Sequence, residues 1–163
     1  MNHILAPDWV RKLKASQNTQ ETGPATDAQV EAADFAAAKG PAFWKQLVKE
    51  LAYAVDELPA LNLQGKLSRH GNPDGQEWCQ ILVARRAVVP INTRTDVFYR
   101  NGDRIIWWRP AGKQALALPF VVCDDGKIGV TATDGFAPMD PVKTAQAIMQ
   151  GIFRVVAPEL VSS

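Results

Sequence analysis

The stretch VFYRNGDRIIWWR, residues 97–109, decides how the middle of this chain folds. Its Asn101-Gly102 pair is a strong signal for a tight β-hairpin turn, and apolar side chains flank the pair on both sides. Neighbouring side chains of an extended strand point to opposite faces, so Trp107 and Trp108 must project to opposite sides of the ribbon. We therefore predict an antiparallel hairpin that is apolar on both faces.

A two-residue loop also predicts the pairing within this hairpin. Arg100 would face Asp103, which places an ion pair beside the turn, and Val97 would face Ile106. The two faces would then carry Phe98, Ile105 and Trp107 on one side and Val97, Tyr99, Ile106 and Trp108 on the other. A sheet face in water is usually polar at alternate positions. One face therefore belongs to the core, and the other needs a cover: a helix of this chain, a second copy of it, or a ligand.

Two further hairpins extend the predicted sheet, and they span residues 61–86 and 117–133. The first alternates apolar and polar positions on either side of the turn-rich segment HGNPDGQ. The second turns at a DG pair, which would place Val121 opposite Val130. The sequence pattern thus predicts about six antiparallel strands in three hairpins.

Helical patterns lie on both sides of these strands. Residues 27–40 form a first predicted helix that ends at Gly40, and Pro41 opens a second one with a clear apolar stripe. Asp140 is the expected N-cap of a C-terminal helix. Its apolar face would consist of Ala145, Ile148, Met149, Ile152 and Val156. Residues 1–26, of which 16–26 are polar and without periodicity, are predicted to be a flexible segment that could contain a short helix.

These elements together predict one α+β domain over residues 27–163. It has N-terminal helices, an antiparallel meander of about six strands built from three hairpins, and a C-terminal helix packed on the sheet. Neither a single helix of this size nor a lone hairpin is stable in water, so each must bury its apolar side on the other.

Composition limits the classes of function. The net charge of +1 gives no global field for nucleic acid or membrane, and no apolar run approaches the length of a membrane span. We see no secretory signal at the N-terminus. Cys79 and Cys123 lie among apolar residues and read as free thiols of a cytoplasmic protein. No spacing of His, Cys or acidic residues suggests a metal or a cofactor.

The sequence carries no recognisable catalytic motif, so we assign no catalytic residue and lean against an enzyme. His70 lies beside a turn without a visible partner that could fix its tautomer. Cys79 sits in an apolar run that favours burial over reactivity. An enzyme centred on His70 or on the thiols stays open.

The leading hypothesis is a non-catalytic domain that binds another protein or a second copy of itself. It would use the second apolar face of the central hairpin, around Tyr99, Arg104, Ile106 and Trp108. An alternative is single-stranded nucleic acid, because residues 61–110 carry eight basic and four acidic side chains, a net charge of +4. The nucleic acid would contact Arg85, Arg86, Arg100, Arg104, Trp107 and Trp108. A small apolar ligand between sheet and helices is the third possibility. No membrane partner is expected.

Overall fold

The computed structural model describes residues 27–131 and 137–161, in a chain that groups into two compact units, 1–34 and 35–163. In the first unit the described residues 27–34 are helical. The predicted flexible segment 1–26 lies outside the described residues. The sheet, residues 35–56 of the N-terminal helix and the C-terminal helix belong to the second unit.

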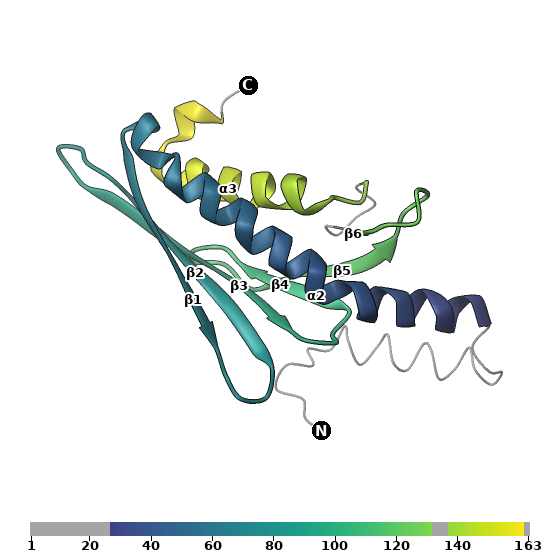
Figure 1. Ribbon diagram of the computed structural model, residues 1–163. Coiled ribbons are helices and arrows are strands. Elements are labelled where there is room, and N and C mark those ends of the chain that lie inside the picture. Colours follow the sequence, from purple (N-terminus) through teal and green to yellow (C-terminus); the bar gives the residue numbers. More distant parts are fainter. Residues whose placement is uncertain (1–26, 132–136, 162–163) are drawn as a thin grey trace. The chain divides into compact units, whose positions relative to one another are not determined.

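Six strands form one antiparallel meander in chain order, as the sequence predicts (Figure 1). They are β1 (Leu63–Gly71), β2 (Gln76–Arg85), β3 (Ile91–Arg100), β4 (Ile105–Arg109), β5 (Leu116–Val122) and β6 (Ile128–Val130). Because each strand pairs with its neighbours in sequence, β1 and β6 are the two edges of the sheet. The fold is α+β.

The N-terminal helical region is one helix, α2 (Asp27–Asp56), where the sequence predicted two. Gly40 does not end the first half, although glycine is a common helix stop. It is buried, and a Cβ added there would lie 2.6 Å from the hydroxyl of Tyr99. Gly40 is therefore a point of close approach to the sheet, and the helix continues through Pro41.

The apolar stripe of α2 packs on the sheet as its spacing predicts. The buried residues are Trp44, Leu47, Val48, Leu51 and Val55, followed by Leu58 in the short 3-10 helix η1 (Leu58–Leu61). The Trp44 ring stacks on Tyr99 of β3 with 5.6 Å between centroids. Phe43 meets Phe120 of β5 edge to face at 5.3 Å.

The C-terminal helix α3 (Pro141–Val156) begins at its predicted cap, where the Asp140 carboxylate accepts a 2.8 Å hydrogen bond from the Lys143 backbone N–H. All five residues of its predicted apolar face are buried. Gly151 faces the Trp108 indole, since an added Cβ would lie 3.0 Å from Cζ2. Helices α2 and α3 cover the same face of the sheet (Figure 1), and η2 (Pro158–Leu160) follows.

The central hairpin closes with a longer loop than predicted. Gly102 has a φ of +89° while Asn101 keeps a negative φ, and the Asp103 N–H donates to the Arg100 carbonyl at 2.9 Å. This is the pattern of a type II turn, and residues 101–104 all lie between the strands. Val97 consequently faces Trp108, so the predicted pairing with Ile106 was wrong by two residues. An even shift leaves every side chain on its predicted face.

The loop between β5 and β6 is longer than predicted too, in this case by one residue. Cys123 N–H donates to the Lys127 carbonyl at 2.7 Å, and Gly126 adopts a φ of +80° inside a three-residue loop. Val130 therefore pairs with Phe120 and not with Val121. A shift of one exchanges the faces, so Phe120 joins the buried side.

Candidate functional site

The two faces of the sheet differ in cover. The face beneath α2 and α3 is almost wholly buried and supplies most of the core. Its strand residues are Leu63, Cys79, Ile81, Val83, Thr93, Thr95, Val97, Tyr99, Ile106, Leu118, Phe120 and Val130. The opposite face, here called the open face, is the one that α2 and α3 do not cover.

Three of the predicted binding residues lie beneath the helices. Tyr99 and Ile106 are 1% and 0% exposed, and half-buried Trp108 packs against the core with its indole N–H 3.4 Å from the Thr95 hydroxyl. The cover that the hairpin required on this face is thus supplied by helices of the same chain. The sequence could not choose between two apolar faces, since both have the same period.

The three predicted arginines do not gather at one place. Arg85 donates to the Val156 carbonyl at 3.2 Å and forms a 2.7 Å ion pair with Glu159, whose pKa this hydrogen bond lowers. Arg85 therefore ties β2 to the end of α3. Arg86 is exposed after β2, and Arg104 is exposed in the loop before β4.

The open face carries a row of rings that crosses four neighbouring strands. His70 pairs with Trp78, Trp78 with Phe98, and Phe98 with Trp107, so the four are direct cross-strand neighbours. The His70 and Trp78 rings stack at 5.3 Å, and the Trp78 and Phe98 centroids lie 6.5 Å apart. We call these four residues the aromatic row. The sequence analysis placed Phe98 and Trp107 on one face but missed their alignment with His70 and Trp78.

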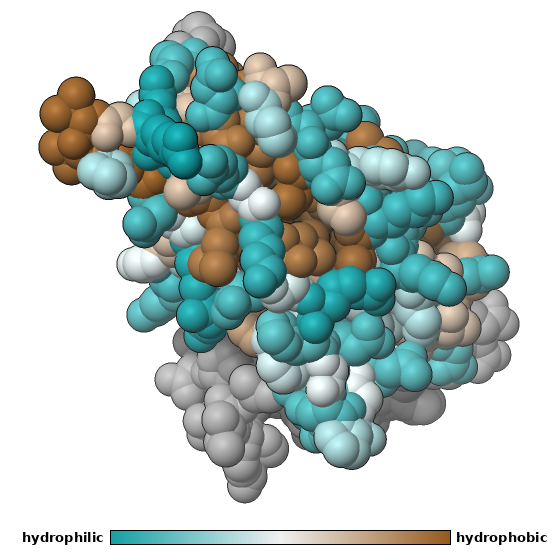
Figure 2. All heavy atoms as spheres, turned by 60° about the vertical axis from the view of Figure 1, so that its left-hand side comes forward, coloured by the Kyte–Doolittle hydropathy of each residue, from teal (hydrophilic) through white to brown (hydrophobic). Residues whose placement is uncertain are grey.

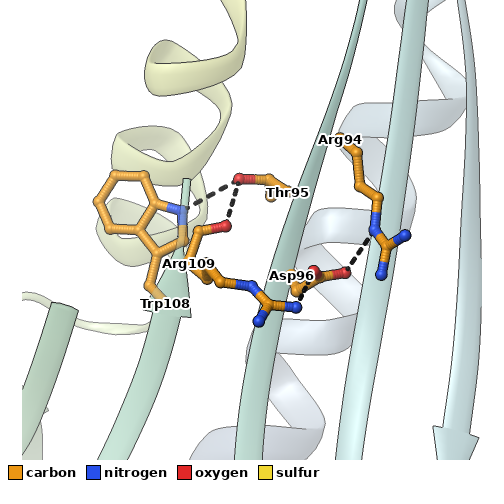
Figure 3. Close-up of polar contacts among 5 residues, drawn as sticks. All are labelled: Arg94, Thr95, Asp96, Trp108 and Arg109. Atoms are coloured by element: carbon orange, nitrogen blue, oxygen red, sulfur yellow. Dashed lines mark hydrogen bonds and ion pairs between the residues drawn. The ribbon is translucent and has the colours of Figure 1, made fainter. Parts of the chain in front are cut away.

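A charged cluster lies beside the aromatic row. The Asp96 carboxylate, 5% exposed, accepts from Arg109 at 2.8 Å and from Arg94 at 3.3 Å (Figure 3). The guanidinium of Arg109 also stands 5.3 Å from the centre of the Phe98 ring. Two cations thus compensate one buried carboxylate, which would otherwise be costly. The alternate positions of Arg94 and Asp96 on one strand were the available signal for this cluster.

Next to these groups the twisted strands β1, β2 and β3 form a shallow hollow of about 390 Å³. Leu82, 41% exposed, lies in its lining, together with Lys66 and Arg94. Figure 2 shows one side of the molecule on which apolar side chains gather and hydrophilic ones surround them. Such an arrangement is typical of a surface that contacts another molecule.

The two thiols considered for catalysis both have a raised pKa. Burial raises the pKa of the Cys79 thiol to about 11, while the charge of Arg69 acts in the opposite direction. The pKa of the Cys123 thiol is also raised, by burial and then by Asp125 and Asp124. A reactive thiol needs the opposite shift. Among the described residues no three His, Cys, Asp or Glu side chains come together as a metal site.

Comparison of the chain with protein-family models, with curated proteins and with solved structures finds no match. None of the helices within 27–131 and 137–161 combines the length and the apolar character that a membrane crossing requires. A functional proposal therefore depends on the surface that the described residues present.

Proposed function

We propose that the chain is a non-catalytic binding module that holds another protein against the aromatic row. The observation that supports this is the position of Trp78 and Phe98, side by side on the sheet face that α2 and α3 leave open. Large aromatic side chains supply much of the binding energy at protein interfaces, and they are enriched there relative to other surfaces. Both are half-buried, which leaves part of each ring accessible.

The charges around the aromatic row favour a protein partner over nucleic acid. Arg94 and Arg109 share Asp96, and Arg100 pairs with Asp74 at 3.4 Å. Binding of nucleic acid needs cations that neutralise phosphates, whereas these arginines already have acidic partners. The two free cysteines are consistent with a cytoplasmic site of action, which we propose on that ground.

The experiment compares Trp78→Ala with Tyr53→Ala, which removes an exposed ring from α2 outside the aromatic row. Both variants are checked for folding by circular dichroism and used with the wild type to capture partners from a cell extract. We expect a protein that the wild type and Tyr53→Ala retain and that Trp78→Ala loses. The same captured proteins for all three chains would contradict the proposal.

A second arm tests the nucleic-acid alternative directly. The wild type is passed over an immobilised single-stranded oligonucleotide at low and at high salt. We expect no retention at either salt concentration. Retention that falls steeply as salt rises would show that phosphates are the ligand, and it would replace the proposed protein partner.

A further inference from the structure

The two edges of the sheet differ in whether another segment pairs with the outer backbone groups. At the β6 edge, Val130 and Met139 exchange two backbone hydrogen bonds, of 3.0 and 2.8 Å, so the segment before α3 closes that side. At the other edge, β1 pairs only with β2, and within the described residues no strand lies on its outer side. With nine residues, β1 is a long edge strand.

The hydrogen bonds of the first hairpin show which backbone groups of β1 point outward. Asn72 N–H donates to the Gln76 carbonyl at 2.9 Å, so these two residues form a hydrogen-bonded pair. Such pairs alternate along an antiparallel ladder, and the residues between them turn their N–H and C=O groups away from the partner strand. The outward residues of β1 are Leu63, Gly65, Leu67, Arg69 and Gly71.

Charge indicates which kind of strand fits this edge. β1 contains Lys66 and Arg69, both exposed, and no acidic residue. In the part of the chain that the structure describes, neither cation forms an ion pair, in contrast to the four arginines discussed above. Pairing of β1 with a second copy of itself would place two positively charged strands side by side and supply no carboxylate to either cation. An acidic strand would place opposite charges there.

We propose that the outer edge of β1 docks an extended acidic segment of another protein, which adds a strand to the sheet. Backbone hydrogen bonds to the outward groups hold the segment, and its carboxylates meet Arg69, whose partner Cys79 places it on the face of β1 opposite to Lys66 and Leu82. On the open face the hollow beside β1, with Leu82 in its lining, receives an apolar side chain of the added strand. This docking needs neither Trp78 nor Phe98, so it can be tested independently of the proposed function of the aromatic row.

The test uses the full ¹⁵N-labelled chain and a blocked peptide of alternating Glu and Val, matched to the nine residues of β1. We expect the peptide to slow hydrogen exchange of the Leu67 and Arg69 amides by about tenfold or more, since exchange requires the new bonds to open. The amides of β6 should not change. A peptide of alternating Lys and Val is the matched control and should not slow exchange.

Two variants of Arg69 test the contribution of its backbone hydrogen bond separately from that of its charge. Arg69→Gln keeps the outward N–H and should weaken peptide binding about threefold to tenfold, because one opposite charge is lost. Arg69→Pro also removes the donor, which an edge strand tolerates, and should abolish the protection. Arg154→Gln removes an exposed charge on α3 and should bind like the wild type.

Three results would overturn the inference. Equal protection by the Lys peptide would remove the charge argument. Peptide binding that leaves the Leu67 and Arg69 amides unprotected would place the site elsewhere. Protection of the same amides that grows with protein concentration, together with a dimer in light scattering, would show that a second copy takes the edge.

Discussion

Ile81 and Leu82 are neighbours in β2, yet Ile81 is 0% exposed and Leu82 is 41% exposed. The difference arises because one points beneath α2 and α3 and the other points to the open face. Both faces of the sheet are rich in apolar residues, so hydrophobicity alone does not separate them. The two faces differ in their neighbours. The covered face packs its aliphatic side chains and the rings of Tyr99 and Phe120 against α2 and α3, whereas the open face carries the aromatic row, a buried carboxylate and arginines.

The largest expected effect contrasts these two neighbours. Ile81→Ala should lower the free energy of unfolding by about 2–5 kcal/mol, because it removes buried methyl groups and leaves a cavity. Leu82→Ala should cost less than about 1 kcal/mol, since much of its side chain already contacts water. Urea denaturation of both variants measures the difference. Equal losses would mean that the open face is as closely packed as the covered one.

The next effect concerns pH and the thiol of the covered face. Burial raises the pKa of Cys79 from 9.0 to about 11, so the folded chain keeps the proton while the unfolded chain releases it. The resulting stabilisation is complete below pH 9 and is lost as pH rises through the folded pKa. We expect a loss of about 2–3 kcal/mol between pH 8 and 11.

Other groups titrate in the same range, so the measurement is a difference between two chains. Denaturation is followed from pH 8 to 11 for the wild type and for Cys79→Ala, and the variant should show the shallower decline. Cys123→Ala is the comparison: the pKa of this thiol is also raised, but Cys123 lies outside the buried core, so its removal should change the decline less than removal of Cys79. Parallel declines for the wild type and Cys79→Ala would show that this thiol titrates normally.

A smaller effect is expected where α3 meets the covered face. Gly151→Ala improves helix propensity by about 1 kcal/mol, but the new Cβ would lie 3.0 Å from the rigid Trp108 ring. We expect the clash to prevail, with a net loss of about 1 kcal/mol in thermal denaturation. In a Trp108→Phe background the same change should become neutral or stabilising. A loss of the same size in both backgrounds would rule out the ring as its cause.

The smallest effect belongs to the open face and its charged cluster. A double-mutant cycle of Asp96→Asn and Arg109→Gln should give a coupling of about 1 kcal/mol, since the carboxylate is buried but the guanidinium is half in water. The matched cycle with Arg94→Gln, whose contact is 3.3 Å long, should give less. A stronger coupling to Arg94 than to Arg109 would contradict the observed geometry.

Much of the fold was predictable because it rests on local periodicity. The stripe from Trp44 to Val55, the cap at Asp140 and the alternation in β2 each occur within one element and need no tertiary information. The registers of two hairpins were not predictable in the same way. Asn101 could form two kinds of turn, and the choice depends on contacts such as the 3.3 Å hydrogen bond from Gly102 N–H to the Tyr99 hydroxyl.

The candidate surface was predictable only in part, for a related reason. Phe98 and Trp107 were placed together on one face from alternation, but the choice of which face the helices take depends on how distant segments pack. The alignment of His70 and Trp78 with these two residues follows from pairing between separate hairpins. The charge of β1 was visible in sequence, whereas its position at an uncapped edge required the strand order.

The four-residue connection at 101–104 sets a rule for changes of length in the central hairpin. Adding or deleting two residues there would shift β4 by two residues relative to β3, and Trp107 and Trp108 would each stay on the same face of the sheet. Adding one would send the Trp108 ring out from under α3 and drive the Trp107 ring beneath it. Insertions and deletions at this connection in related sequences should therefore contain an even number of residues.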